Sequence, residues 1–377
     1  MRDVMAEGSP FQSFFMAGFE CSSHRRADGR RLDLLASTGH DRWAAEDYGA
    51  VAAHGLRTVR DGVRWHRVEA QAGHHDWSSV LPQVRAARAA GVQVIWDLCH
   101  YGWPDHLDIW RPAFVDAFAR YAAAFARLLR EEGETRPCLA PINEISYWAW
   151  AGGDQGLFNP GARGRGQELK HQLVRASIAA IEAIRAELPA ARFLAIDPLI
   201  HVAARRPEQR EAAEGYRQAQ FEAWDLLSGR QWPGLGGRPD YLDILGLNYY
   251  SDNQWYLGGG TLAAEDPAYR PLQGMLAEVH QRYGRPLLIA ETGAEGPARA
   301  AWLEHVADQV GRALRQGVPV QGICLYPVLD YPGWDDDRLC PTGLFGVADG
   351  AGHRALHEPL AEVLQRQRQL LAGGEGR

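Results

Sequence analysis

Eight short apolar segments recur along the 377-residue sequence, and segments with helical periodicity separate them. Such segments are typical of parallel strands, which are apolar throughout because helices cover both faces of a parallel sheet. Alternation of strands with helices predicts one parallel sheet, and eight such units close into a (β/α)8 barrel, the TIM-barrel form of the α/β class. The predicted strands are Phe14–Phe19, Thr58–Gly62, Val92–Leu98, Cys138–Asn143, Phe193–Asp197, Ile244–Tyr249, Leu287–Glu291 and Gly322–Tyr326.

Helical periodicity predicts a helix after each of these strands. Pro112 stands in the first turn of one helix, where its missing N–H costs nothing, and Gly91 closes another. We expect residues 1–372 to form a single barrel domain and residues 373–377 to be a disordered tail. The alternative fold is an open doubly wound sheet, but Gly18–Cys21 does not match the G-x-G-x-x-G signature of that fold. The predicted helices are Trp43–His54, Trp77–Ala90, Pro112–Glu131, Gly166–Leu188, Gln209–Leu227, Leu272–Tyr283, Ala298–Gln316 and Leu360–Leu371.

Composition excludes several classes of partner. The net charge of −7 provides no basic surface, so we expect no nucleic-acid partner. No segment reaches the ~18 apolar residues of a membrane span, and no signal-peptide pattern opens the chain. The five cysteines are scattered without metal-ligand spacing, so neither a disulfide framework nor a metal site is expected. We therefore predict a soluble, cytoplasmic protein without cofactor or metal, and the sequence carries no signal for its oligomeric state.

Two of the predicted strands lead into a glutamate. Glu144 follows the run Pro141–Asn143, and Glu291 ends the run that begins at Pro286. The carboxyl ends of barrel strands meet on one face, so we expect these two side chains to lie close together. Paired carboxylates are what cleavage of a sugar acetal needs, because one donates a proton and the other attacks or stabilises the cation. Solvated loop glutamates are the alternative interpretation.

Further polar residues follow other strands. Arg60 either pairs with its neighbour Asp61 or faces a carboxylate inside the barrel, where a buried arginine needs a partner. His100 is either a ligand of the substrate or a core histidine whose hydrogen bonds are satisfied. Two of the four asparagines, Asn143 and Asn248, also close apolar strands, which favours a functional cluster over chance.

Five motifs stand in order at these strand ends: Thr58–Trp65, Cys99–Pro104, Ile142–Glu144, Gly246–Ser251 and Ile289–Gly293. They are similar to five motifs of glycoside hydrolase family 1, the β-glucosidase family of clan A. The family motifs are Tyr-Arg-Phe-Ser-Ile-Ser-Trp, His-Trp-Asp-x-Pro, Thr-Phe-Asn-Glu-Pro, Gly-Ile-Asn-Tyr-Tyr-Thr and Ile-Thr-Glu-Asn-Gly. The resemblance extends over nearly the whole chain, which looks like a divergent member of that family.

The resemblance implies a retaining exo-β-glycosidase that works by double displacement through a glycosyl-enzyme intermediate. Glu144 would be the acid/base and Glu291 the nucleophile, with carboxyl groups about 5–5.5 Å apart. Arg60 would keep Glu291 ionised, while that charge and nearby aromatic rings would raise the pKa of Glu144 and keep it protonated. The implied sugar-binding residues are His100, Asn143 (at the 2-hydroxyl), Trp103, Trp334 and Tyr326. The residues implied to orient the nucleophile are Arg60, Asn248 and Tyr250.

The chain also departs from the family. Gly333 stands where the family has a glutamate that grips the outer hydroxyls of the sugar. The family's glutamine after the first strand has no clear match, and Glu20 or His24 would have to replace it. The resemblance further implies a cis Tyr326–Pro327 peptide bond. Two alternatives stay open: a barrel that binds carbohydrate without cleaving it, and a transglycosylase that uses a sugar acceptor.

The loop after the eighth strand makes one substrate class unfavourable. It carries Asp335, Asp336 and Asp337, where family members that act on phosphorylated sugars place cationic and hydroxyl groups. Three acidic side chains repel a phosphate. We therefore expect aryl 6-phosphoglycosides to be hydrolysed more slowly than the same glycosides without phosphate, and faster turnover of the phosphorylated substrate would contradict this.

Overall fold

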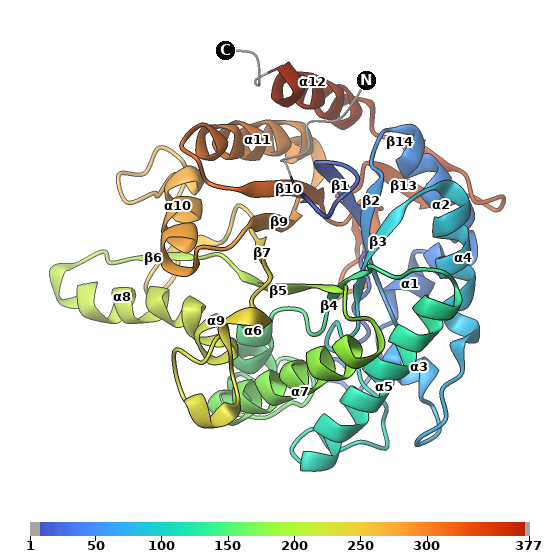
Figure 1. The fold of residues 1–377 in the computed structure, drawn as a ribbon. Coiled ribbons are helices and arrows are strands. Elements are labelled where there is room, and N and C mark those ends of the chain that lie inside the picture. Colours follow the sequence, from blue (N-terminus) through green and yellow to red (C-terminus); the bar gives the residue numbers. More distant parts are fainter. Residues whose placement is uncertain (1–7, 374–377) are drawn as a thin grey trace.

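Eight parallel strands form a closed barrel in the computed structural model, which describes residues 8–373 (Figure 1). The strands are β1 (Phe15–Gly18), β2 (Thr58–Gly62), β3 (Gln93–Asp97), β4 (Cys138–Ala140), β5 (Arg192–Pro198), β7 (Ile244–Asn248), β9 (Leu287–Thr292) and β10 (Val320–Leu325). Each strand pairs with the next along the chain, and β10 pairs with β1 to close the ring. The (β/α)8 prediction is confirmed, and every predicted strand overlaps an observed one.

Helices surround the barrel, as Figure 1 shows, and form its outer layer. The predicted helix over Gln209–Leu227 is interrupted by a 3-10 turn, and the one over Trp77–Ala90 begins with such a turn. The longer helices are α2 (His40–Ala53), α4 (Leu81–Ala90), α5 (Pro112–Glu131), α7 (Gly166–Glu187), α8 (Arg210–Gln218), α10 (Leu272–Tyr283), α11 (Arg299–Arg315) and α12 (Glu358–Gly373). The short helices are α1 (Leu34–Ser37), α3 (Trp65–Val68), α6 (Ile145–Trp148) and α9 (Glu222–Leu227).

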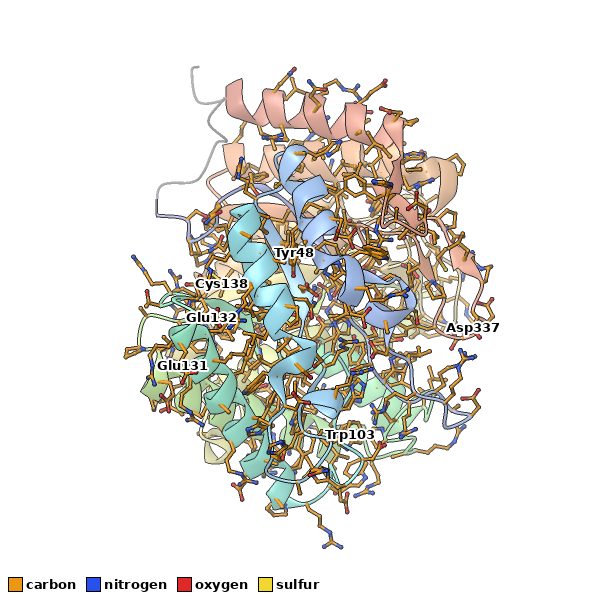
Figure 2. All side chains as sticks on the ribbon, turned by 90° about the vertical axis from the view of Figure 1, so that its right-hand side faces the viewer. Tyr48, Trp103, Glu131, Glu132, Cys138 and Asp337 are labelled. Atoms are coloured by element: carbon orange, nitrogen blue, oxygen red, sulfur yellow. The ribbon has the colours of Figure 1, made fainter. Side chains whose placement is uncertain are left out.

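Within residues 8–373, three small two-stranded sheets, which the sequence does not predict, stand outside the barrel. They pair β6 (His201–Ala203) with β8 (Gln254–Tyr256), β11 (Tyr331–Pro332) with β12 (Leu339–Cys340), and β13 (Phe345–Ala348) with β14 (Arg354–Leu356). The loop between β11 and β12 contains Asp337. In Figure 2 this residue lies on the side of the molecule away from Cys138, the first residue of β4, and therefore on the carboxyl-end side of the barrel.

Side chains alternate between the inside and the outside of the barrel wall. A buried cluster fills the interior, and Met16, Ile95, Leu194, Ile244, Leu288 and Cys324 belong to it. On β2, Arg60 points inward, whereas Asp61 points outward to helix α2 and accepts hydrogen bonds from Tyr48 (2.5 Å) and His40 (2.9 Å). Arg60 and Asp61 therefore do not pair, because neighbouring residues of a strand face opposite sides.

The structure also tests several smaller expectations. The Tyr326–Pro327 peptide bond is cis, as predicted. All five cysteines are buried and free. Helix α12 continues to Gly373, and residues 374–377 of the predicted tail lie outside the described residues. Within residues 8–373, no helix combines the length and the apolar character that crossing a bilayer requires.

Candidate active site

Arg60 lies at the carboxyl end of the barrel and is completely buried. All five of its N–H groups donate hydrogen bonds. Nε and Nη2 reach the two oxygens of Asp97 at 3.0 and 2.6 Å, and Nη2 also reaches Asn143 Oδ1 at 2.7 Å. Nη1 reaches Glu291 Oε1 at 2.6 Å and the Ala290 carbonyl at 3.2 Å. The planar guanidinium therefore joins residues from the ends of four strands, which a lysine could not do with three donors.

Arg60 also fixes the direction of the hydrogen bonds beyond it. Because a guanidinium only donates, the amide oxygen of Asn143 must face Arg60 and the amide NH2 must face away. Asn143 Nδ2 donates to the Tyr101 hydroxyl at 3.0 Å. The Tyr101 hydroxyl has one proton, and it donates that proton to Glu144 Oε2. A continuous chain of hydrogen bonds thus connects Glu291, Arg60, Asn143, Tyr101 and Glu144.

The two glutamates have different partners. Tyr250 donates to Glu291 Oε2 at 2.8 Å, so both oxygens of Glu291 accept a hydrogen bond. Asn248 donates to Glu144 Oε1 at 2.8 Å, so both oxygens of Glu144 also accept one. The sequence predicts that Asn248 orients Glu291, but the structure places its amide against Glu144. Arg60 and Tyr250 supply the hydrogen bonds to Glu291 instead.

Both carboxyl groups have pKa values above the ordinary range. Burial raises the pKa of Glu144, and the charge of Asp197 raises it further against two hydrogen bonds that lower it. The sequence predicts this direction and attributes it to the charge of Glu291 and to nearby aromatic rings, whereas the structure gives burial first and then the charge of Asp197. Burial also raises the pKa of Glu291, although Arg60 acts in the opposite sense. Arg60 therefore favours the ionised form of Glu291, as the sequence predicts, but burial opposes it with the larger effect.

Two members of this network are not predicted from the sequence. Tyr101 stands at the tryptophan position of the His-Trp-Asp-x-Pro motif, and that replacement is the signal that could have identified it. Asp97 is the last residue of β3 and is completely buried. A carboxylate inside an otherwise apolar strand needs a buried cation, which Arg60 supplies.

Cys21, Asp97 and His100 form a second cluster beside the network. Cys21 Sγ, a carboxylate oxygen of Asp97 and a ring nitrogen of His100 lie within 4.8 Å of one another, an arrangement that could hold a metal ion. Both oxygens of Asp97 already accept from Arg60, whose positive charge would repel a cation. His100 Nδ1 lies 3.2 Å from Asp97 Oδ2 and from Cys21 Sγ, while its Nε2 accepts from Asn143 Nδ2 at 3.1 Å. We interpret the cluster as a structural one, in which Asp97, Cys21 and Asn143 hold the His100 ring in a fixed orientation.

The predicted sugar-binding aromatic residues fall into two groups. Tyr326 stacks on His100 with ring centroids 6.2 Å apart, and the Arg60 guanidinium lies 5.1 Å from the centre of its ring. Trp334 packs against Tyr101 with centroids 5.7 Å apart. These two therefore border the network. Trp103 (Figure 2) does not join it, because its indole N–H donates to a backbone carbonyl at 3.0 Å and its ring packs against Trp148.

The chain departs from the family motifs at Gly333 and at the glutamine position that Glu20 or His24 would have to fill. A Cβ atom at Gly333 would lie 3.0 Å from Asp336 Oδ1 and 3.3 Å from Cys340 Sγ, so a side chain at this position would fit tightly against the same loop. Glu20 accepts hydrogen bonds from the backbone and the hydroxyl of Ser22. His24 lies beside Trp334 with ring centroids 4.6 Å apart, and its buried Nδ1 has no hydrogen-bond partner among the described residues. Burial lowers the pKa of His24 to about 3, so this ring is neutral.

Asp197 holds the turn that carries Glu144. Glu144 adopts a left-handed backbone with φ 47°, directly before helix α6. Asp197, on β5, accepts hydrogen bonds from the Ser146 backbone N–H at 2.9 Å and the Ser146 hydroxyl at 3.0 Å. Burial raises the pKa of Asp197 to about 7, despite these donors. The acidic residue behind Glu144 thus changes its charge near neutral pH.

Comparison with known proteins gives a likeness in fold. No family model and no curated protein sequence matches the chain. A family 1 β-glucosidase from Thermotoga maritima has a TM-score of 0.74 at 18% identity, covering 88% of this chain and 87% of that one. A β-glucosidase from Thermotoga maritima in complex with cyclophellitol has a TM-score of 0.77 at 15% identity, covering 98% and 99%. A hyperthermophilic β-glucosidase mutant has a TM-score of 0.76 at 16% identity, covering 93% and 98%. The chain therefore shares the fold of the family 1 β-glucosidases.

Asp197 provides a test of the site's electrostatics. Its carboxyl group binds a proton more tightly in the folded state, with a pKa of about 7 against the usual 3.8. The contribution of this carboxyl to stability should therefore fall as the pH rises from about 4 to about 7. Asp197→Asn removes this effect. The free energy of unfolding of the variant minus that of the wild type should therefore increase by up to roughly 4 kcal/mol over this range. Urea unfolding at a series of pH values measures the difference, and a difference that is constant with pH would contradict the buried, protonated carboxyl.

Proposed function

We propose that the protein is a divergent member of glycoside hydrolase family 1 and a retaining exo-β-glycosidase. The observation that carries the proposal is the hydrogen-bond chain from Glu291 through Arg60 to Glu144, because it supplies two carboxylates in different environments. Glu291 is adjacent to the buried Arg60 cation. Glu144 accepts hydrogen bonds from the neutral donors Tyr101 and Asn248. Different environments let one carboxylate attack while the other carries a proton.

The mechanism assigns one role to each glutamate. The Glu291 carboxylate, oriented by Arg60 and Tyr250, attacks the anomeric carbon and forms a glycosyl-enzyme. Glu144 gives its proton to the leaving oxygen in the same step. When Glu291 has become an ester its charge is gone, and Glu144 can take a proton from the attacking water. The sugar is then released with its original anomeric configuration.

The proposed partner is a β-linked carbohydrate or glycoside, and this chemistry requires no metal or cofactor. His100, Tyr326 and Trp334 border the network and are the proposed sugar contacts, together with Asn143. Solved β-glucosidases of the same fold hold glucoimidazole and azafagomine, which supports carbohydrate binding in this barrel. Five free, buried thiols support a location in a reducing compartment, the cytoplasm.

A barrel that binds carbohydrate without cleaving it is the second candidate, and one observation favours it. Both oxygens of Glu144 already accept hydrogen bonds, so this carboxyl is arranged as an anion rather than as an acid. Gly333 points in the same direction, because a glycine stands where the family has a sugar-gripping carboxylate. A transglycosylase uses the same first step and differs only in the acceptor.

A panel of aryl β-glycosides (gluco, galacto, fuco, manno, xylo and glucuronic) tests the proposal. We expect release of the aryl group from at least one member, and a fall in kcat of at least ~10⁴-fold in Glu291→Ala because the nucleophile is lost. Glu304→Ala is the matched control, since Glu304 is an exposed residue of α11 paired with Arg366. Activity that survives Glu291→Ala would contradict the assignment.

Covalent labelling separates the candidates. A 2-fluoroglycoside of the preferred sugar should add one label, on Glu291, as found by peptide mass analysis. A protein that binds the sugar but acquires no label would be the non-catalytic barrel. Product analysis with and without an added alcohol or sugar acceptor then separates hydrolysis from transglycosylation.

A further inference from the structure

We propose that the Tyr101 hydroxyl is a positioning group that confines the catalytic proton of Glu144 to one carboxyl oxygen, Oε1. The inference rests on the proposed function for its catalytic consequence, but its structural basis is separate. Tyr101 is not among the residues that the family motifs assign, because a tryptophan stands at this place in the motif.

The Tyr101 ring is held rigidly. The side chain is completely buried, and Trp148, Phe158 and Trp334 pack against it with centroids 5.3–5.7 Å away. Its backbone is left-handed, with φ 66°, a conformation that a residue with a side chain rarely adopts. A strained backbone and a fully packed ring leave the hydroxyl oxygen one position.

The direction of the hydroxyl proton follows from Arg60. Arg60 can only donate, so it holds the Asn143 oxygen and turns Asn143 Nδ2 toward the Tyr101 oxygen. The Tyr101 oxygen therefore accepts from Asn143, and its single proton points to Glu144 Oε2. Because Oε2 already accepts this hydrogen bond, protonation of Glu144 at Oε2 is disfavoured.

The other oxygen of Glu144 has a partner that can adapt. Asn248 donates to Oε1, and the Asn248 Oδ1 atom is buried without a hydrogen-bond partner among residues 8–373. A half-turn of this amide, whose oxygen and nitrogen have nearly the same shape, would present Oδ1 to a proton on Oε1. Tyr101 and Asn248 together thus accommodate both the acid and the base form of Glu144.

Other titratable groups also act on Glu144 and must be separated from Tyr101. They are Asp197 on β5, His100 after β3, Glu291 on β9, Tyr250 after β7 and Tyr147 on α6. Tyr101 differs from these groups in that its hydroxyl donates directly to the carboxylate. Removing only that hydroxyl withdraws a donor that stabilises the anion, so Glu144 should hold its proton to higher pH.

The test compares Tyr101→Phe with Tyr48→Phe. Tyr48 is a matched control because it is also completely buried and also donates to a carboxylate, Asp61, but on the outer side of the barrel. In protein labelled with ¹³C at the glutamate carboxyls, the Glu144 signal is assigned by its loss in Glu144→Gln. We expect Tyr101→Phe to shift its titration to higher pH by about one unit, and Tyr48→Phe to leave it in place.

Kinetics give the second readout. The alkaline limb of the pH profile of kcat/KM should move to higher pH by about the same amount in Tyr101→Phe. Titration and limb both unchanged would overturn the inference while leaving the glycosidase proposal intact. A shifted titration in a protein that hydrolyses no glycoside would instead uphold the positioning role and reject the proposed function.

A third variant tests the inference even if Tyr101→Phe does not fold. Replacement of Tyr101 by 3-fluorotyrosine keeps the shape of the ring and makes the hydroxyl a stronger donor. The Glu144 titration should then move to lower pH, opposite to the effect of Tyr101→Phe. A shift in the same direction as Tyr101→Phe, or none, would overturn the inference.

Discussion

The buried guanidinium of Arg60 is the interaction on which the site depends. Its charge is compensated by Asp97 and Glu291, and its remaining donors are used by Asn143 and a backbone carbonyl. Removing either carboxylate would leave buried guanidinium N–H groups without an acceptor, which typically costs about 1–3 kcal/mol. Because the guanidinium cannot accept a hydrogen bond, it also sets the orientation of each group beyond it. The Arg60 guanidinium therefore sets both the charge balance and the geometry at the carboxyl end of the barrel.

The two glutamates have different surroundings in one site, and the proposed mechanism gives them different roles. Burial raises the pKa of both, but Glu291 is compensated by a cation and Glu144 by the neutral donors Tyr101 and Asn248. A cation favours a permanent anion, whereas neutral donors allow a carboxyl to gain and lose a proton. Asp197 behind Glu144 adds a charge that itself varies near neutral pH. The proposed acid and base steps of Glu144 need a carboxyl group that can both hold and release a proton.

Local sequence patterns predicted the framework well. Thr58–Gly62 and Pro112–Glu131 have the predicted bounds, because apolar runs and helix-end residues act over a few positions. The pairing of side chains across the barrel mouth was predicted less well. Asn248 lies in register with Glu291 on the neighbouring strand, yet its amide contacts the other carboxylate. The replacement of the motif tryptophan marks Tyr101 as unusual, but its hydrogen bonds depend on ring packing and on the orientation of distant donors, which spacing in the sequence does not encode.

The stereochemistry of the first product tests the central claim most directly. The proposed double displacement requires the two carboxyl groups to lie about 5–5.5 Å apart, a spacing that leaves no room for a water between the sugar and the nucleophile, so attack comes from the carboxylate of Glu291 itself. Proton NMR of the anomer formed in the first minutes of hydrolysis of an aryl β-glycoside should show the β-anomer. Appearance of the α-anomer first would mean direct attack by water, and would contradict the proposed roles of both glutamates.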